Sequence, residues 1–337
     1  MKNKSLRKTI FNVFFFIIIV LLTFYIIFKD NDVKSIICTI KNVNLVFIGL
    51  ALIFMLIFVS CEGINIRRVL NTCGYKISFI KSFKYALVGF FFSSITPSAS
   101  GGDPAQLYFM KKDKLPVAHS ALALLVELSS FQLVSITIAI IGFIHNYDLL
   151  MNNIGNIKYL MFLGLIINII ILLCLLVVLF SRVFAYKLLK IICKILRLLK
   201  YKKIKAFKSN FSNQIEEYHK CAIYLKNNKL VICKIIFTTT FQLTLYYSIP
   251  YLVYLSFGLN EVSFLTFIFM EAVLYISVSS LPLPGSMGVS EGGFMIMFKM
   301  FFPANILNSA MLLSRGISFY LFVILSGLLI TLFIIVG

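Results

Sequence analysis

The sequence predicts an all-α, polytopic membrane protein with about six transmembrane helices and two re-entrant helical hairpins in an inverted-repeat arrangement. Its 337 residues are 60% hydrophobic and 13% charged, with a mean hydropathy of +0.98, which is more apolar surface than a soluble core can bury. Several apolar windows are long enough to cross about 30 Å of hydrocarbon. Two shorter apolar arms, 82–95 and 263–281, run directly into Pro- and Gly-rich stretches, which favours helices that are interrupted within the membrane.

The long windows define the predicted spanning helices. The first follows a basic N-terminus, but it is too long for a signal-peptide core and no small-residue cleavage pattern follows it, so we expect it to be retained. The predicted spans are residues 9–28, 44–62, 118–143, 159–181, 230–257 and 304–336.

These windows predict one domain, residues 1–337, built of two halves. The segments are an N-terminal helix with its external loop (1–43), a first half (44–181) containing a hairpin (82–112), a basic loop (182–229), and a second half (230–337) containing another hairpin (263–302).

The distribution of the net charge of +20 predicts the orientation in the membrane. Loop 182–229 holds thirteen Lys or Arg residues against Glu216 and Glu217, and other basic residues gather in alternate loops. By the positive-inside rule, the N-terminus and this loop are expected on the cytoplasmic side of a bacterial cell membrane.

Loop 182–229 also contains an amphipathic run, "VFAYKLLKIICKILRLLKYKKIK", which is expected to bind anionic lipids of the inner leaflet. A simpler alternative is that the loop only determines topology. Nucleic acid is not an expected partner, because the loop contains no folded reader module.

No cofactor is expected. The seven cysteines are scattered without a C-x-x-C pattern or a histidine at metal-ligand spacing, and they give no functional indication. No ATP-binding loop of the G-x-x-x-x-G-K-[ST] type is present, so transport would depend on a lipid gradient or a coupled ion.

The first hairpin centres on "SSITPSASGGDPAQ", residues 93–106, and both of its flanks are expected on the cytoplasmic side. The second centres on "SVSSLPLPGSMGVSEGGF", residues 277–294, and is expected to enter from outside. In each, an apolar arm ends in serines and a proline, followed by glycines and an acid. Broken helices that meet near the midplane from opposite faces are typical of transporter binding sites.

Local chemistry at the two tips predicts short helices whose N–H groups face the membrane centre. Asp103 reads as an N-cap with Pro104 in the first helical position, and Ser286 or Ser290 could cap the second helix. Free N–H groups at such termini attract anions, while glycines let the backbone approach a ligand. The predicted hairpin backbone positions are Pro97, Gly101, Gly102, Pro104, Pro284, Gly285, Gly288 and Gly292.

Charged residues of the two halves are spaced alike. Glu127 follows Asp103 by 24 residues, and Arg315 follows Glu291 by 24 residues. Because intramembrane charges are costly, they usually face a partner or a cavity. We therefore expect Asp103, Glu127, Glu291 and Arg315, with Glu271 on the entering arm of the second hairpin, to form a cavity for a lipid headgroup. Simpler alternatives are that Asp103 only caps a helix, that Glu127 and Arg315 neutralise one another, and that the prolines only mark helix ends.

The combination of "TPSASGGDPAQ" early and "PLPGSMGVSEGG" late resembles the flippase-like membrane domain of lysylphosphatidylglycerol synthases, the multiple peptide resistance factor family. The resemblance covers roughly residues 10–336, and Pro284 to Gly292 is its more specific part. It implies two re-entrant hairpins and translocation of an aminoacylated phospholipid, which contributes to membrane charge and to resistance against cationic peptides. Bifunctional members carry a soluble acyltransferase domain after the membrane part; none follows here, so no lysyltransferase activity is expected of this chain alone.

Three functions fit this sequence. The chain could translocate a lipid of the lysylphosphatidylglycerol type, or transport another amphiphile such as a polyprenyl-linked sugar or a small anion. It could instead be a membrane partner of a separate lysyltransferase or other lipid-modifying enzyme, recruited through loop 182–229. The sequence does not indicate an oligomeric state.

Overall fold

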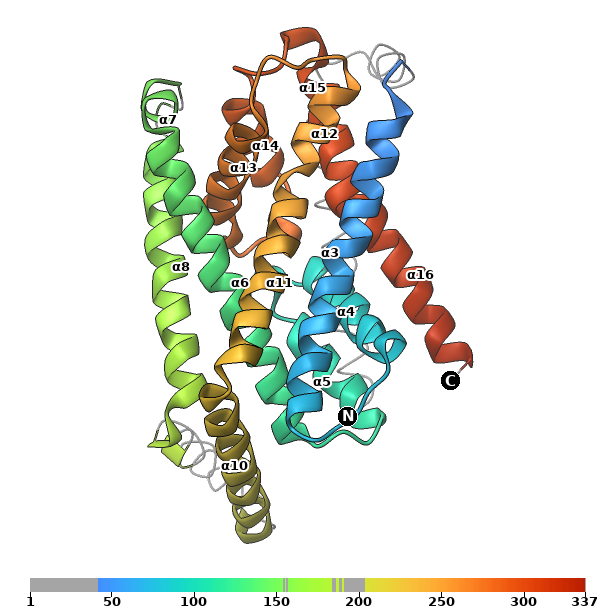
Figure 1. Ribbon diagram of the computed structural model, residues 1–337, viewed down its shortest axis with the longest axis vertical. Coiled ribbons are helices and arrows are strands. Elements are labelled where there is room, and N and C mark those ends of the chain that lie inside the picture. Colours follow the sequence, from blue (N-terminus) through green and yellow to red (C-terminus); the bar gives the residue numbers. More distant parts are fainter. Residues whose placement is uncertain are drawn as a thin grey trace.

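A computed structural model describes residues 42–336 except 154, 156, 184, 185, 188, 189 and 191–203. Within these residues the chain is helical and contains no β-strand, which confirms the predicted all-α class. The long helices form a bundle with α7 (Tyr147–Asn153) at one end and α10 (Ile204–Asn227) at the other, and we use these two helices to name the ends (Figure 1).

Five helical segments are long and apolar enough to cross a membrane, which confirms a multi-pass membrane protein. The predicted span 9–28 lies outside the described residues. The span predicted over 230–257 is made of α11 (Lys229–Tyr247) and α12 (Ile249–Ser256), which join at Ser248 just before Pro250. The five segments are Leu45–Thr72 (α3), Val117–His145 (α6), Lys158–Phe180 (in α8, Ile157–Phe180), Lys229–Ser256, and Ala304–Phe333, which runs through α15 (Ala304–Arg315), η3 (Gly316–Tyr320) and α16 (Leu321–Val336).

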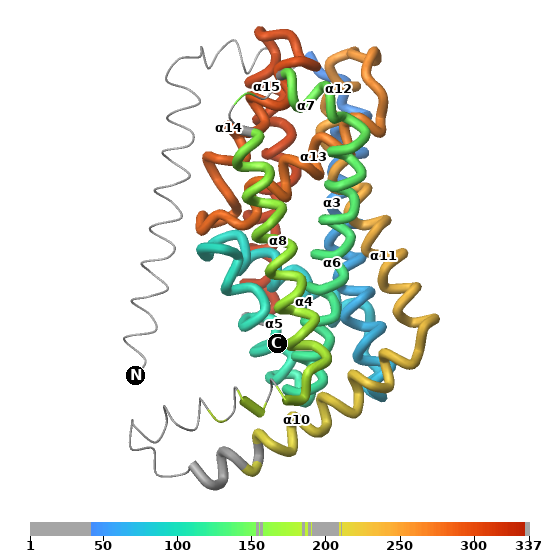
Figure 2. Tube along the Cα trace, turned by 90° about the vertical axis from the view of Figure 1, so that its left-hand side faces the viewer, coloured from blue at the N-terminus to red at the C-terminus, as the bar shows by residue number. Residues whose placement is uncertain are grey.

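Two helical hairpins lie between the spans. Hairpin one consists of α4 (Phe79–Ser94), the short turn η1 (Pro97–Ala99) and α5 (Gly102–Lys112). Hairpin two consists of α13 (Phe264–Ser279), η2 (Pro284–Ser286) and α14 (Val289–Met297). Each hairpin begins and ends at one end of the bundle, hairpin one near α10 and hairpin two near α7, and the tips η1 and η2 contact each other (Figures 1 and 2).

Both entering arms start with the same cap. Ser78 accepts a hydrogen bond from the backbone of Lys81 at the start of α4, and Ser263 accepts one from Thr266 at the start of α13. A serine oxygen at this position satisfies one of the free N–H groups of the first turn. The two arms therefore start from well-defined points at opposite ends of the bundle.

Close helix packing brings the two halves together. Helix α8 packs against both α6 and α13, and a methyl group on Gly164 of α8 would lie 2.6 Å from the carbonyl oxygen of Ile276. Gly142 of α6 is similarly close to Phe269. Because lipid tails are as apolar as leucine, helices in a membrane associate largely through such small-residue contacts.

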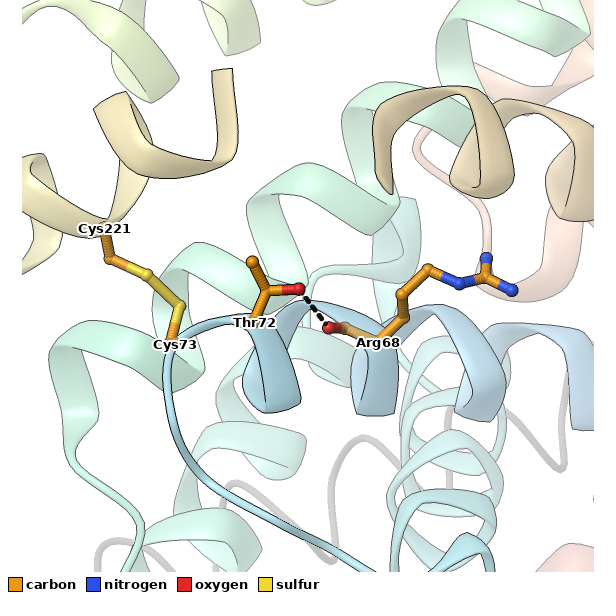
Figure 3. Close-up of a disulfide and its surroundings, with 4 residues drawn as sticks. All are labelled: Arg68, Thr72, Cys73 and Cys221. Atoms are coloured by element: carbon orange, nitrogen blue, oxygen red, sulfur yellow. Dashed lines mark hydrogen bonds between the residues drawn. A yellow bond between two sulfur atoms is a disulfide. The ribbon is translucent and has the colours of Figure 1, made fainter. Parts of the chain in front are cut away.

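Helix α10 is held to the bundle by a disulfide that the sequence analysis did not predict. Cys73, the C-cap of α3, is bonded to Cys221 of α10 across 148 residues of sequence, with Cα atoms 6.0 Å apart. Thr72 donates a hydrogen bond to the carbonyl of Arg68 in the last turn of α3 (Figure 3). The sequence analysis looked only for local cysteine motifs and missed this bond, because the two residues are brought together only by tertiary packing.

Much of the basic loop lies outside the described residues. Within the described part, Arg182 and Tyr186 both bond to the carboxylate of Glu216. The hydrogen bond from Tyr186 makes the largest contribution to lowering the pKa of the partly exposed Glu216 below its ordinary value, and the bond from Arg182 makes the next largest.

Candidate functional site

A cavity of about 270 Å³ lies where the two hairpin tips meet. Residues of both hairpins and of the spans α3, α6, α11 and η3 face it, so it lies inside the bundle at the junction of the two halves. Three of the predicted site side chains line it, Asp103, Glu127 and Arg315, as does the backbone of Gly285. Non-helical backbone at membrane depth is tolerated where it lines such a cavity.

The two tips share an unusual backbone. A proline, Pro97 or Pro284, starts each short turn, and the next two residues adopt left-handed φ angles: 51° and 53° at Ser98 and Ala99, and 55° and 51° at Gly285 and Ser286. Left-handed φ is costly for residues that carry a Cβ and clusters at functional sites. The predicted correspondence of the two tips is confirmed at the level of the backbone.

Two glycines are required by close contacts at the tips. A methyl group on Gly102 would lie 2.0 Å from the hydroxyl of Ser93, and one on Gly285 would lie 2.1 Å from the ring of Phe319. Gly292 has open space around it and is not required sterically.

The predicted helix caps were wrong. Helix α5 begins at Gly102 with Gly101 as its N-cap, so Asp103 lies inside the first turn and makes no capping hydrogen bond. Helix α14 is capped at Gly288, whose N–H donates to Glu291 Oε2 at 2.6 Å. Ser286 instead donates to the carbonyl of Val278. Both N-caps are glycines: Gly288 has a φ of 82°, which favours glycine, and a methyl group on Gly101 would lie 2.6 Å from the Thr96 side chain.

One side of the cavity is acidic. Glu62 of α3, Asp103 of α5 and Glu127 of α6 line it, and none has a salt-bridge partner among the described residues. Within the described part of the chain, the side-chain hydrogen bond to these acids comes from Gln106, which donates to Glu62 Oε1 at 2.6 Å. A cavity with three unpaired carboxylates attracts cations.

On the other side of the cavity, a basic side chain is paired. Arg315 Nε donates to Glu291 Oε1 at 2.8 Å, and Arg315 Nη2 donates to the carbonyl of Gly285 at 3.1 Å. Tyr320 also donates to Glu291, and the guanidinium lies 4.7 Å from the centre of the Phe319 ring. The alternative in which Glu127 and Arg315 form a pair was wrong, since Arg315 is bound by Glu291 of the hairpin that precedes its span.

Two predicted site acids do not line the cavity. Glu291 is 3% exposed, and it accepts a hydrogen bond from Arg315, which does line the cavity. Glu271 of α13 lies behind the lining, and its Oε2 is buried without a hydrogen-bond partner among the described residues.

Among the lining residues that the sequence analysis missed are Glu62 and Gln106, which are bonded to each other. The predicted span 44–62 ends at Glu62, which placed this acid at a loop boundary. Helix α3 instead continues to Thr72, because its later polar residues find partners: Arg68 donates to Thr238 and to the carbonyl of Lys234, and Asn65 donates to Thr239. The continuing apolar periodicity after Glu62 was the signal that could have revealed this.

Fold and site together define a polytopic membrane protein in which two opposed re-entrant hairpins enclose a polar cavity. Residues 12–326 match the family described as the lysylphosphatidylglycerol synthase TM region, and the chain belongs to this family. It is also similar to a UPF0104 membrane protein of Archaeoglobus fulgidus, at 24% identity over 307 residues that cover 88% of this chain and 89% of that protein. The resemblance inferred from the two motifs is thereby confirmed, and the family points to a role connected with membrane lipids.

Proposed function

We propose that the chain moves an aminoacylated phospholipid of the lysylphosphatidylglycerol type between the two leaflets of its membrane. The observation that carries this proposal is the charge of the central cavity, where three unpaired carboxylates face one arginine that already has an acidic partner. A lysyl headgroup carries two ammonium groups and one phosphate, so it fits this excess of negative charge. A headgroup with phosphate alone fits less well.

The cavity offers a place for each part of that headgroup. Glu62, Asp103 and Glu127 would accept hydrogen bonds from the ammonium groups, which are strongest between charged partners. Arg315 donates one hydrogen bond from Nε to Glu291 and one from Nη2 to the carbonyl of Gly285. Because a guanidinium has five N–H donors, Arg315 retains donors for a phosphate oxygen.

A lipid headgroup can enter the cavity only if the cavity has an opening through which the acyl tails remain in the membrane. Ser98, Ala99 and Asp103 line the cavity and are exposed, so the cavity is not sealed at the tip of hairpin one. The tips reach the cavity from opposite ends of the bundle, and a rearrangement of one hairpin against the other would expose the headgroup to either side in turn.

The proposal is tested by reconstituting the protein in liposomes with fluorescent lysylphosphatidylglycerol or phosphatidylglycerol and measuring exchange between leaflets. We expect faster exchange of the lysyl lipid. Glu62→Gln, Asp103→Asn and Glu127→Gln should each abolish that exchange, because each removes a charged acceptor without changing side-chain volume.

The matched control is Glu217→Gln, which makes the same chemical change at an exposed position of α10 that does not line the cavity. It should exchange lipid as the unmodified protein does. Exchange that persists in all three cavity variants would refute the proposal, and loss of function only when loop 182–229 is removed would favour a role in recruiting a lipid-modifying enzyme.

A further inference from the structure

A second cavity, of about 200 Å³, lies between α6, α8, α10 and α11. It shares no lining residue with the cavity between the hairpin tips, which we call the headgroup cavity. We call this second cavity the side cavity. The described residues of its wall are aliphatic and aromatic except for Ser129, Ser130 and Lys226, and none of them is acidic. This volume is roughly seven times that of one water molecule in the liquid, which leaves room for a stretch of several methylene groups.

The side cavity reaches the outer surface of the bundle within the spans. Leu133, Leu176 and Phe180 line it and are 42%, 37% and 40% exposed, so its edge faces the surroundings of the helices rather than the protein interior. These residues belong to α6 and α8, two of the membrane-spanning helices. Since apolar cavities do not retain water, hydrocarbon from the membrane is the expected content.

A positive charge stands at the α10 end of the side cavity. Lys226, in the last turn of α10, is exposed and lines the cavity, and its ammonium lies 5.6 Å from the centre of the Phe180 ring. Lys229 follows directly at the start of α11. A lysine at the end of a spanning segment lies at headgroup depth, where it attracts anionic lipid.

One polar group in the wall lacks a partner. Ser129 is 6% exposed, and its hydroxyl has no hydrogen-bond partner among the described residues, whereas Ser130 bonds to the carbonyl of Glu127. A hydroxyl donor can bond to the ester carbonyl that joins an acyl chain to glycerol. An apolar cavity with a lysine at its edge and a spare hydroxyl donor in its wall offers the chemistry that an anionic phospholipid needs.

We propose that the side cavity binds one acyl chain of an anionic phospholipid, whose phosphate lies at Lys226. The bound lipid would fill the space between α10 and the spans, and so hold α10 against the membrane. This proposal does not depend on lipid translocation, because none of the residues involved lines the headgroup cavity.

The test uses phosphatidylglycerol and phosphatidylcholine probes with a photoreactive diazirine in one acyl chain, in liposomes containing the full chain. Labelled peptides are identified by mass spectrometry. We expect labels on the wall of the side cavity, from α6, α10 and α11, and more labelling by phosphatidylglycerol than by phosphatidylcholine.

Two variants should fill the side cavity and remove this labelling. Ala222→Phe places a ring in the wall at a position that is 1% exposed, and Leu176→Trp blocks the exposed edge without touching the interior of the bundle. If the first variant fails to fold, the second still gives an answer. Labelling at the same peptides in a folded filling variant would overturn the proposal, since the probe would then reach these peptides from outside the cavity.

The role of the charge is tested separately. Lys226→Glu should lower the ratio of phosphatidylglycerol to phosphatidylcholine labelling by about fivefold or more, since one lysine near the surface contributes about 1 kcal/mol. Lys220→Glu is the matched control, because it changes the same helix in the same way at an exposed residue that does not line the cavity. Glu127→Gln should leave the labelling unchanged. An equal fall in the ratio for both lysine variants would show general attraction to the membrane and overturn the assignment to Lys226.

Discussion

The two hairpins have similar backbone conformations at their tips, but the acids at the starts of their second helices have opposite surroundings. In hairpin two, the acid of the first helical turn, Glu291, is bound by Arg315, Tyr320 and the N–H of Gly288. In hairpin one, Asp103 occupies the corresponding helix without a cap bond or a salt bridge, and it shares the cavity with two further acids. The path of each tip is set by its proline and left-handed residues, whereas its charge is set by what the neighbouring spans supply.

This difference distinguishes an acid that stabilises the fold through an ion pair from acids that are free to bind a ligand. An ion pair inside the bundle holds hairpin two to the span that follows it, and removal of one partner leaves an uncompensated charge. Unpaired acids at a cavity contribute little to stability and remain free to bind a ligand. Variants of the two hairpins should therefore differ in what they lose.

The largest expected effect is in hairpin two. Arg315→Met leaves the carboxylate of Glu291 buried without its cation, and should lower the free energy of unfolding by about 3–5 kcal/mol. Unfolding in SDS or by heat, followed by size-exclusion chromatography, measures this loss. The double variant Glu291→Gln/Arg315→Met should recover most of it, because no charge is then left unpaired; a double variant as unstable as the single one would contradict this explanation.

A smaller effect is expected from added bulk at the tips. Gly285→Ala forces a methyl group against Phe319 at a φ of 55°, and should cost about 1–3 kcal/mol. Gly102→Ala should cost a comparable amount, since its methyl group would lie 2.0 Å from the Ser93 hydroxyl and 2.9 Å from the backbone carbonyl oxygen of Gly89, which cannot rotate away. Gly292→Ala, with nothing within 4 Å, serves as the control in the same thermal assay and should leave stability unchanged.

For the acids of hairpin one and its neighbours, we expect little change in stability. Glu62→Gln and Glu127→Gln each remove a like charge from the side of the cavity where no acid has a basic partner among the described residues, and the free energy of unfolding should change by less than about 1 kcal/mol or rise. Thermal unfolding of the variants that have lost lipid exchange provides the measurement. A loss as large as that of Arg315→Met would mean that these acids have a structural role, and the contrast between the hairpins would disappear.

The smallest effect is expected outside the spans, where Arg182 and Glu216 form an exposed pair. Arg182→Gln should leave the melting temperature unchanged, because water and salt screen exposed pairs. The pKa of Glu216 is lowered, so any contribution of the pair is present above the ordinary glutamate pKa and is lost as the pH falls through the lowered value. Melting temperatures of the unmodified protein and of Arg182→Gln, measured as the pH falls below the ordinary glutamate pKa, test this. A clear fall in the unmodified protein alone would contradict the expectation and show that the pair stabilises α10.

The sequence predicted the hairpins because their signals are local. Prolines, glycines and serines within fourteen or eighteen consecutive residues determine where each helix breaks, and apolar window lengths determine which helices span. The pairing of Arg315 with Glu291 rather than Glu127 depends on distances between helices, which no spacing rule encodes. The caps were misplaced by two residues for a similar reason, since the start of each helix depends on the path of the tip before it.

Glu62 and the pair Cys73–Cys221 show where sequence reasoning fails most. Glu62 was missed because hydropathy windows end at charges, while the helix continues as long as its polar residues find partners on α11. The cysteines lie 148 residues apart and meet only when α10 packs against the end of α3. Both features depend on contacts between elements that are distant in the chain.

The disulfide between Cys73 and Cys221 makes it possible to determine the orientation of this protein in the membrane by a chemical measurement. The positive charge of the α10 segment favours the cytoplasm, where thiols are normally kept reduced, whereas a lasting disulfide favours the oxidising exterior. Trapping free thiols in living cells with a membrane-permeant alkylating reagent, and counting the added mass on Cys73 and Cys221, therefore reports which face of the membrane α10 occupies. Two alkylated thiols would place it among the reducing metabolites of the cell interior, and their protection would place it outside.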